Sequence, residues 1–309
     1  MTVTDGSFWL GPVCALLSSL TWALGSSMYA SHAGRVGALE VNLTRALLAA
    51  PLYFAAAAVL CGPTAFWAFS RPQLGWLGLS VACSYVVGDT LFYTAGLRLG
   101  TPTALAIGSI YPVWSTLLGV VSFGEPLGLH RGLGTLLCVC GVIWLVLLRS
   151  VPTPHPRYQT GWSRLHGVGL AILTSLCWAG NTYSVRQGGT NQNPLVINAV
   201  RYTLAAFVLL VVWFVAVRRR SDEKLLMAPR ALLRFLPVVL IEALFGSTIF
   251  VYAMTHTDLS IAAPLASLSP LFSVPIGLVL RTERLCVRRL AAIAITVAGV
   301  TFLVVSPKP

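Results

Sequence analysis

Long apolar runs recur along almost the whole of this 309-residue chain, and they constrain its fold more than any other feature. A helix needs about 20 mainly apolar residues to cross the hydrocarbon core of a bilayer. Ten runs of about this length are separated by short charged or Pro/Gly-rich stretches. They occupy residues 8–30, 39–61, 73–97, 101–122, 131–148, 166–186, 194–217, 231–254, 259–280 and 287–306. The sequence therefore predicts an all-α integral membrane protein with ten transmembrane helices.

The composition favours membrane helices over a soluble domain or a transmembrane β-barrel. Hydrophobic residues make up 56% of the chain and charged residues 10%, which is too little charge to cover a soluble domain of this size. A β-barrel would show segments of about ten residues with alternating apolar and polar positions. The stretches "ALLAAPLYFAAAAVL" and "GTLLCVCGVIWLVLL" are instead apolar on every face.

Basic residues give the chain a net charge of +12. They lie mostly in loops next to the predicted spans, which favours a role in setting membrane topology over nucleic-acid binding. With ten spans, most of them fall on one side, in loops such as "RRRSDEK" and "RTERLCVRR". The positive-inside rule then predicts that these loops are cytoplasmic and both termini external. The first seven residues, "MTVTDGS", have no Lys or Arg, so we expect no cleavable signal peptide.

Signatures of an enzyme, a metal site or a cofactor site are weak. The seven cysteines lack paired metal-ligand spacing, and no P-loop, HExxH or nucleophile elbow is present. The stretch "VVGDT" places Gly-Asp inside a span, as in an intramembrane aspartyl protease. However, Val86 stands where that motif has its first glycine, and the obvious second carboxylate is Glu242 rather than an aspartate. We therefore expect no enzyme, no metal and no cofactor, with the protease as the weaker alternative.

The two halves of the chain are similar to each other. A shift of 156 residues aligns "ALLSSLTWALG" (15–25) with "AILTSLCWAGN" (171–181), and a shift of 158 aligns residues 88–147 with 246–305. Residues that are rare in spans match: Trp22 with Trp178, Arg45 with Arg201, Pro112 with Pro270 and Glu125 with Glu283. The sequence therefore predicts a duplication, with repeats at 13–148 and 166–305 and a connecting loop at 149–165.

Each predicted repeat contains five spans, and this odd number has a consequence for topology. The second repeat must enter the membrane from the side opposite to the first, so the repeats are inverted. Inverted repeats are a common construction of secondary transporters, whose halves enclose a site near the bilayer midplane and expose it alternately to each side. The architecture alone thus favours a transporter.

The motifs resemble those of the EamA family in the drug/metabolite transporter superfamily. The resemblance rests on a Trp in the first span of each half ("SLTWALG", "SLCWAGN"), an early Arg in the second ("LTRALLAA", "AVRYTLAA") and a Pro-to-Glu pattern in the fourth ("YPVWSTLLGVVSFGEPL", "SPLFSVPIGLVLRTERL"). The resemblance implies a multi-pass plasma-membrane transporter, frequently an exporter, of a small metabolite. It also implies cytoplasmic termini, against the charge bias. Arg281 and Thr282 replace Phe123 and Gly124 of the first half.

Four ionisable residues inside the predicted spans are the first candidates for a site, because a charge in the membrane is costly and is usually retained for function. Asp89 and Glu242 are candidates for a substrate partner or a proton-coupling group. Asp89 aligns with Ser247, so no fixed structural partner is expected for it, and Glu242, near the start of its helix, is expected to be half-hydrated. Arg45 and Arg201 are interpreted as structural, in an interhelical ion pair or reaching the headgroups.

Prolines in the fourth and ninth spans, and stripes of polar and aromatic residues along one face of the first, third and sixth spans, supply the remaining candidates. Pro112 is expected to bend the fourth span near the midplane, with Ser109 and Ser267 satisfying the backbone groups that the paired prolines release. Glu125 is expected to lie hydrated at the membrane exit, and a gating pair with a loop arginine such as Arg131 remains open.

The sequence thus predicts a central substrate cavity. Its predicted residues are Trp22, Ser26, Tyr85, Asp89, Tyr93, Ser109, Pro112, Trp178, Asn181, Glu242, Ser267 and Pro270, with structural or gating roles for Arg45, Arg201, Glu125 and Glu283. The expected partners are a small-molecule substrate, the lipid bilayer and protons as a coupling ion, with no nucleic acid and no specified oligomeric state. A channel or a lipid-carrier flippase of the same architecture remains an alternative.

Overall fold

A computed structural model describes residues 7–148, 161–216, 229–279 and 286–305, and every regular element in these ranges is a helix. The first half contains α1 (Ser7–Val36), α2 (Ala38–Cys61), the 3₁₀ turn η1 (Pro63–Ala68), α3 (Arg71–Val81), the π-helical η2 (Ala82–Val86), α4 (Gly88–Leu99), α5 (Thr101–Gly108), α6 (Tyr111–Phe123) and α7 (Leu129–Leu147). The second half contains α8 (Gly161–Gly189), α9 (Pro194–Ala216), α10 (Pro229–Val238), the π-helical η4 (Val239–Gly246), α11 (Ser247–His256), α12 (Leu259–Ala266), α13 (Ser269–Val279) and α14 (Val287–Val304).

Each of the ten predicted runs coincides with one helix or with consecutive helices. Eight of these segments are long and apolar enough to cross a membrane. The exceptions are α1, whose apolar part is the shorter stretch Trp9–Gly25, and α8, which carries buried polar residues along its length. The prediction of a multi-pass all-α membrane protein is confirmed, and the count of ten crossings stays a prediction.

Helix boundaries repeat between the halves with the spacing found in the sequence. Adding 158 to the bounds of α5 gives residues 259–266, which are the bounds of α12. Adding 158 to the first residues of α6 and α7 gives 269 and 287, where α13 and α14 begin. The π-helical segments η2 and η4 also lie at corresponding positions. The duplication therefore extends to the positions at which helices begin and break.

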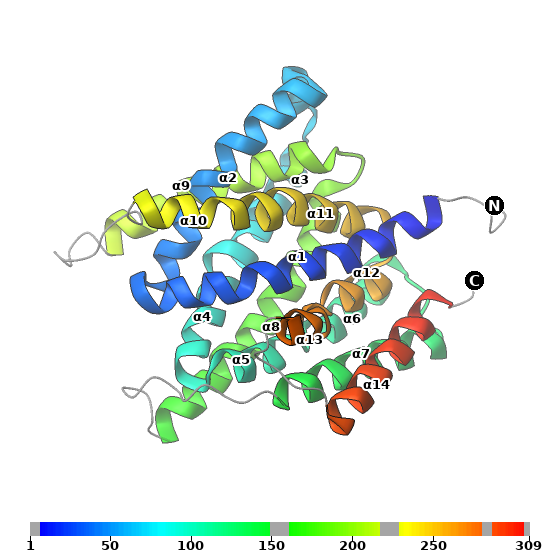
Figure 1. Cartoon of the computed structure of the whole chain (residues 1–309). Coiled ribbons are helices and arrows are strands. Elements are labelled where there is room, and N and C mark those ends of the chain that lie inside the picture. The colour runs from blue at the N-terminus through cyan, green and yellow to red at the C-terminus, as the bar shows by residue number, and fades with distance from the viewer. Residues whose placement is uncertain (1–6, 149–160, 217–228, 280–285, 306–309) are drawn as a thin grey trace.

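Corresponding helices of the two halves pack against each other (Figure 1). Helix α2 lies along α9, and α7 lies along α14, at opposite sides of the bundle. Helices α1 and α8 run through the middle, where α1 contacts η4 and α11 while α8 contacts α3 and α4. The described start of α1 and the described end of α14 lie at the same end of the bundle.

Glycines allow α7 and α14 to approach closely. A Cβ built on Gly299 would lie 2.6 Å from the backbone nitrogen of Cys138 and 2.8 Å from the carbonyl oxygen of Gly134. A Cβ on Gly141 would lie 2.9 Å from the backbone nitrogen of Thr296. Small residues let helix backbones touch in membranes, where apolar side chains gain little by leaving the lipid. Close packing of α7 against α14 therefore requires glycine, which has no side chain, at these positions.

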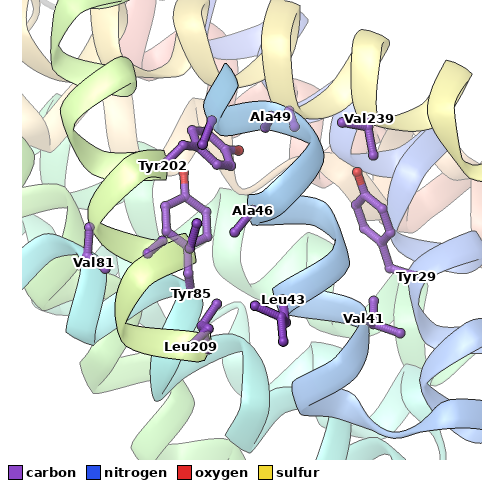
Figure 2. Packing of buried hydrophobic residues seen from close by; sticks show 14 of the residues in the cluster. Tyr29, Val41, Leu43, Ala46, Ala49, Val81, Tyr85, Tyr202, Leu209 and Val239 are labelled. Atoms are coloured by element: carbon purple, nitrogen blue, oxygen red, sulfur yellow. The ribbon is translucent and has the colours of Figure 1, made fainter. Parts of the chain in front are cut away.

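Large apolar side chains cover the outside of the bundle, as a lipid-facing surface requires. Val59, Val121 and Phe207 are 81%, 82% and 65% exposed. Inside the bundle, aromatic rings lie on both sides of α2 (Figure 2). Figure 2 shows Tyr85 and Tyr202 on one side of α2 and Tyr29 on the other. These tyrosines border the candidate site.

Pro112 does not bend a continuous helix, contrary to the sequence-based expectation. Helix α5 ends at Gly108 and α6 begins at Tyr111, so Pro112 lies in the first turn of a new helix. A proline is well tolerated there, because the N–H that it lacks would have no partner inside the helix. Pro270 has the same position at the start of α13. The fourth and ninth predicted spans are therefore broken into two helices each.

Candidate functional site

A cavity of about 140 Å³ lies inside the bundle, between the two halves of the chain. Its lining residues are Ser18, Thr21, Trp22, Arg45, Ser84, Tyr85, Asp89, Leu105, Ser109, Tyr111, Trp178, Asn181, Thr182, Arg201, Tyr202, Glu242, Gly246, Ser247, Phe250, Ala266, Ser267 and Ser269. Aromatic faces and hydroxyl, amide, carboxylate and guanidinium groups thus meet in one space. Such a mixture suits a small molecule with a polar and an apolar part.

The two π-helical segments bring polar residues to this cavity. Segment η2 carries Ser84 and Tyr85, and η4 carries Glu242. A π-helical turn contains one extra residue, which shifts the following side chains around the helix and often marks a functional site. Gly88 begins α4, separated from the end of η2 by one residue, and a Cβ there would lie 2.3 Å from the carbonyl oxygen of Cys83. The tight backbone of this turn therefore requires glycine.

Asp89 forms a buried ion pair with Arg45. Arg45 Nη2 lies 2.6 Å from Asp89 Oδ2, and Trp178 Nε1 donates to Asp89 Oδ1 at 3.1 Å. Arg45 is 1% exposed, so it does not reach toward headgroups. The expectation that Asp89 has no fixed partner is wrong, because folding brings α2 and α8 to the two sides of its carboxylate.

Glu242 lies within the same cluster. The hydroxyl of Tyr29 donates to Glu242 Oε2 at 2.7 Å, and Arg45 Nη1 lies 3.9 Å from that oxygen. Glu242 is buried, in the middle of the continuous segment formed by α10, η4 and α11. The expected half-hydrated location near a helix start is therefore wrong, because the helix begins more than three turns earlier. Arg45 thus faces two carboxylates.

Arg201, the counterpart of Arg45, has a different environment. It is 1% exposed, and within the described residues its guanidinium donates to neutral oxygens alone. The bonds go to Ser80 Oγ at 2.9 Å, Asn198 Oδ1 at 3.1 Å, Asn181 Oδ1 at 2.8 Å and Ser84 Oγ at 3.5 Å. In the described part of the chain, no carboxylate oxygen lies within the 4.0 Å of an ion pair.

The ring of Tyr85 lies near both arginines. Its centroid is 5.0 Å from Arg45 Cζ and 5.2 Å from Arg201 Cζ, which places both guanidiniums in cation–π range. Tyr202 packs on Tyr85 with ring centroids 4.8 Å apart. The hydroxyl of Tyr202 is buried and has no hydrogen-bond partner among the described residues. Tyr202 is therefore a lining residue whose hydroxyl has no partner in the described part of the chain.

Ser109 and Ser267 line the cavity at the breaks between helices. Ser267 Oγ donates to the carbonyl of Pro264 at 2.7 Å, which satisfies a backbone group near the break between α12 and α13. Ser109 closes the end of α5 through its own N–H, which donates to the carbonyl of Leu105 at 2.8 Å. The two serines thus act in different ways at the equivalent breaks of the two halves.

The predicted cavity residues divide into three groups. Trp22, Tyr85, Asp89, Ser109, Trp178, Asn181, Glu242 and Ser267 line the cavity, together with Arg45 and Arg201. Tyr93, Pro112 and Pro270 are buried but are outside its lining. The side chain of Ser26 and all of Glu283 lie outside the described residues. That the lining binds a substrate stays a prediction.

The sequence-based list missed several polar lining residues, including Ser84, Tyr111, Tyr202 and Ser247. The repeat contained a signal for two of them. A shift of 158 places Ser84 on Glu242 and Asp89 on Ser247. A serine that aligns with a cavity carboxylate is itself expected at the cavity. Tyr111 and Tyr202 had no such signal.

Glu125 closes one end of the bundle instead of remaining hydrated. It is 5% exposed and accepts the first N–H groups of α12, from Leu259 N to Oε1 at 2.7 Å and from Ser260 N to Oε2 at 2.9 Å. A carboxylate is favourable at a helix N-terminus, where N–H groups lack partners inside the helix. The expectation of a hydrated Glu125 is therefore wrong.

A charged network extends from Glu125. Arg186 at the end of α8 lies 3.3 Å from Glu125 Oε1, whereas Arg131 pairs with Asp258 at 2.8 Å. The arginine that pairs with Glu125 is thus Arg186, and the suggested pairing with Arg131 is wrong. Gly124, with a φ of 64°, ends α6 in the left-handed conformation and turns Glu125 toward α12. We call Glu125, Arg131, Arg186 and Asp258 the end network.

Comparisons with known proteins agree with this architecture. The family model described as "EamA-like transporter family" matches residues 9–147 and residues 165–305. A protein of Archaeoglobus fulgidus named "Uncharacterized transporter" is 23% identical over 294 residues, covering 95% of this chain and 97% of that protein. A solved crystal structure shares the fold, with a TM-score of 0.72, 16% identity and coverage of 97% of both chains.

Proposed function

Because the chain belongs to the EamA-like transporter family, we propose that it is a secondary transporter that moves a small polar or amphipathic metabolite by alternating access. It is a multi-pass membrane protein, and its relative in Archaeoglobus fulgidus is named a transporter. The resemblance to the family supports export across the plasma membrane. The class of substrate, the direction of transport and the alternating-access motion are what we propose beyond family membership.

One observation carries the proposal: the buried cavity is lined by both repeats and contains charged groups that a packed core would avoid. Trp22, Tyr85 and Asp89 come from the first repeat, and Trp178 and Glu242 come from the second. Ion pairs in a membrane interior are expensive and are retained mainly for function. A cavity shared between repeats can open toward either side when the repeats tilt against each other.

The broken helices support the same mechanism. The breaks between α5 and α6 and between α12 and α13 border the cavity at Ser109 and Ser267. With five spans in each repeat, the two breaks are related by inversion, and unwound backbone at a cavity is a common feature of transporter sites. Each break can act as a hinge for its half of the bundle.

The end network provides a closure at one end. Glu125, Arg186 and Asp258 join the end of α6, the end of α8 and the start of α12. In the proposed cycle these contacts separate when the cavity opens on that side. A closing contact between charged groups suits this task, because water solvates the same groups once they separate.

Proton coupling remains part of the proposal, with Asp89 and Glu242 as the candidate groups. Asp89 is held by Arg45 at 2.6 Å, whereas Glu242 lies 3.9 Å from the same guanidinium. A substrate or proton that enters the cavity changes the balance of charge among Arg45, Asp89 and Glu242. The geometry argues against an aspartyl protease, because an arginine occupies the position between the two carboxylates.

The test is transport by the purified full chain in proteoliposomes, with amino acids, nucleotides, sugars and cationic drugs offered with and without a pH gradient. Accumulation of one class supports the proposal. Ion conductance without accumulation would indicate a channel, and movement of a fluorescent lipid between leaflets would indicate a flippase. Asp89→Asn should alter the rate or its pH dependence, and Arg71→Gln, at an exposed residue, is the control. An unchanged Asp89→Asn variant excludes coupling through Asp89.

A further inference from the structure

We propose that Arg201 binds an anionic group of the transported molecule, in the position where its counterpart Arg45 holds carboxylates of the protein. The inference deepens the proposed function and rests on it. It concerns the chemical class of the ligand: a small organic anion, such as a carboxylate with an apolar body.

The repeat relates the surroundings of Arg45 to those of Arg201. Arg45 lies 2.6 Å from Asp89 and 3.9 Å from Glu242. The repeat places Asp89 on Ser247 and Glu242 on Ser84. Both serines are linked to Arg201, Ser84 directly and Ser247 through Asn198. Ser84 Oγ lies 3.5 Å from Arg201 Nη2, and Ser247 Oγ donates at 3.3 Å to Asn198 Oδ1.

The bonds of Arg201 complete this comparison. The same Asn198 Oδ1 accepts a hydrogen bond from Arg201 Nη1 at 3.1 Å. Ser84 thus contacts Arg201 directly and Ser247 reaches it through Asn198, and the positions of both carboxylates near Arg45 carry hydroxyl groups in the other half. The repeat thus keeps the arginine, as Arg201, but has serines at the two positions that correspond to the carboxylates neutralising Arg45.

The energetic consequence is an incompletely neutralised buried charge. A buried guanidinium is costly unless it is both hydrogen-bonded and paired with a negative charge. Arg201 has the hydrogen bonds, from Ser80, Asn181, Asn198 and Ser84, but no carboxylate within ion-pair distance among the described residues. An anion that enters the cavity would supply the missing charge.

The two carboxylates that line the same cavity as Arg201 already have partners. Asp89 is occupied by Arg45 and by Trp178, and Glu242 by Tyr29. The ring of Tyr85 lies within 5.2 Å of Cζ in each arginine. The aromatic ring lets two like charges share one cavity, but it gives Arg201 no full negative charge.

An independent observation also points to a ligand that accepts hydrogen bonds. The hydroxyl of Tyr202 is buried, and Tyr202 lines the same cavity as Arg201. This hydroxyl is one of several buried side-chain groups that have no hydrogen-bond partner within the described part of the chain. A bound anion offers several acceptor oxygens. The faces of Tyr111 and Trp178 provide the apolar wall for the rest of the molecule.

The experiment measures binding and uses the matched series benzoate, benzamide and benzylamine, with phenyl phosphate as a second anion. The purified full chain is heated with each compound at equal ionic strength, and its unfolding is followed by intrinsic fluorescence. We expect the anions to raise Tm and the neutral and cationic compounds to leave it unchanged. Stabilisation by benzylamine or benzamide equal to that by benzoate overturns the proposal, and so does absence of stabilisation by both anions.

Two variants of one position test the role of Arg201 without removing it. Ser247→Asp places a carboxylate at the counterpart of Asp89, where it gives Arg201 an internal counter-ion. We expect it to weaken benzoate binding by about tenfold or more, the size of one charge-assisted hydrogen bond. Ser247→Asn, which matches Ser247→Asp in size but is neutral, is the reference variant, and it should bind benzoate about tenfold or more tightly than Ser247→Asp does. Equal binding by Ser247→Asp and the parent overturns the proposal.

Failure of this inference and failure of the proposed function give different results. If the protein transports a cation or a neutral compound and Ser247→Asp does not change that transport, the proposed transporter function stands and the proposed anion site is rejected. If the protein binds the anions, Ser247→Asp abolishes that binding and the proteoliposomes transport none of the compounds offered, the anion site stands and the proposed transporter function is rejected.

Discussion

Arg45 and Asp89 form an ion pair inside the bundle, with Nη2 2.6 Å from Oδ2 and both side chains buried. The pair joins α2 to α4 and borders the cavity. In a secondary transporter, such a pair stabilises one arrangement of the helices and can also respond to a ligand. Its energetic role can be separated from its transport role by substitutions.

Arg45→Met should destabilise the protein more than Asp89→Asn. The first change leaves Asp89 and Glu242 buried without their shared cation, and breaking a buried pair in this way costs about 3–5 kcal/mol. The second change leaves Arg45 beside Glu242, which remains a counter-ion at 3.9 Å. Thermal unfolding in one detergent measures the difference. The double variant should recover part of the loss, and a larger loss from Asp89→Asn would contradict the prediction.

Glu125→Gln should open the end network. Glutamine keeps one carbonyl oxygen, so it cannot accept from both Leu259 and Ser260 while facing Arg186 with a negative charge. A cysteine introduced at Thr182, which lines the cavity and is 1% exposed, should then react faster with a membrane-impermeant thiol reagent. The measurement is the rate relative to the Thr182→Cys parent, with native cysteines subtracted.

Arg71→Gln is the matched control for this measurement, because Arg71 is exposed and charged but lies outside the end network. It should leave the labelling rate unchanged. If Glu125→Gln also leaves the rate unchanged while the protein remains folded, the network does not close the cavity.

Gly299→Ala should destabilise the contact between α7 and α14. Its Cβ would lie 2.6 Å from the backbone nitrogen of Cys138, and backbone cannot move aside as a flexible side chain can. Overpacking of this kind costs about 1–3 kcal/mol. Gly132→Ala on α7, where a Cβ meets nothing within 4 Å, should instead stabilise by about 0.5–1 kcal/mol through helix propensity. Thermal unfolding of both variants checks the opposite signs.

Trp178→Phe should reduce transport while the fold is retained. The change removes the Nε1 donor that reaches Asp89 Oδ1 at 3.1 Å, but a ring remains to pack on Phe92 and Tyr111. Loss of one hydrogen bond to a charged group corresponds to about 1.5–3 kcal/mol, or roughly tenfold or more in apparent affinity. The KM for any substrate identified in proteoliposomes measures it. Trp67→Phe, at an 88% exposed residue, is the control, and equal values for both would refute the prediction.

The sequence predicted much of the fold because its two main signals are local. Apolar length marks each helix, and the repeat shift of 158 residues predicts where α12 and α14 begin from α5 and α7. The interpretation of Pro112 was wrong for a local reason as well. A proline in a long apolar run is compatible with a kink or with the start of a second helix, and apolarity alone does not distinguish the two.

The site was less predictable, because its central contacts join residues far apart in the chain. The rarity of charge in membrane spans identified Arg45, Asp89 and Glu242 as candidates without indicating that they meet. Glu125 was expected to be hydrated because the sequence alone does not show that the N-terminus of α12 lies next to its carboxylate. Distances between such groups depend on helix packing.

By itself the sequence determined an all-helical membrane protein built from two similar halves, because hydrophobicity and duplication are properties of the chain. Only the tertiary structure decided the partners of its buried charges. Packing places Arg45 against two carboxylates and Arg201 against neutral oxygens alone in the described part of the chain. The physical reason is that electrostatic energy depends on separations of a few ångströms between helices, and the order of residues along each helix does not specify them.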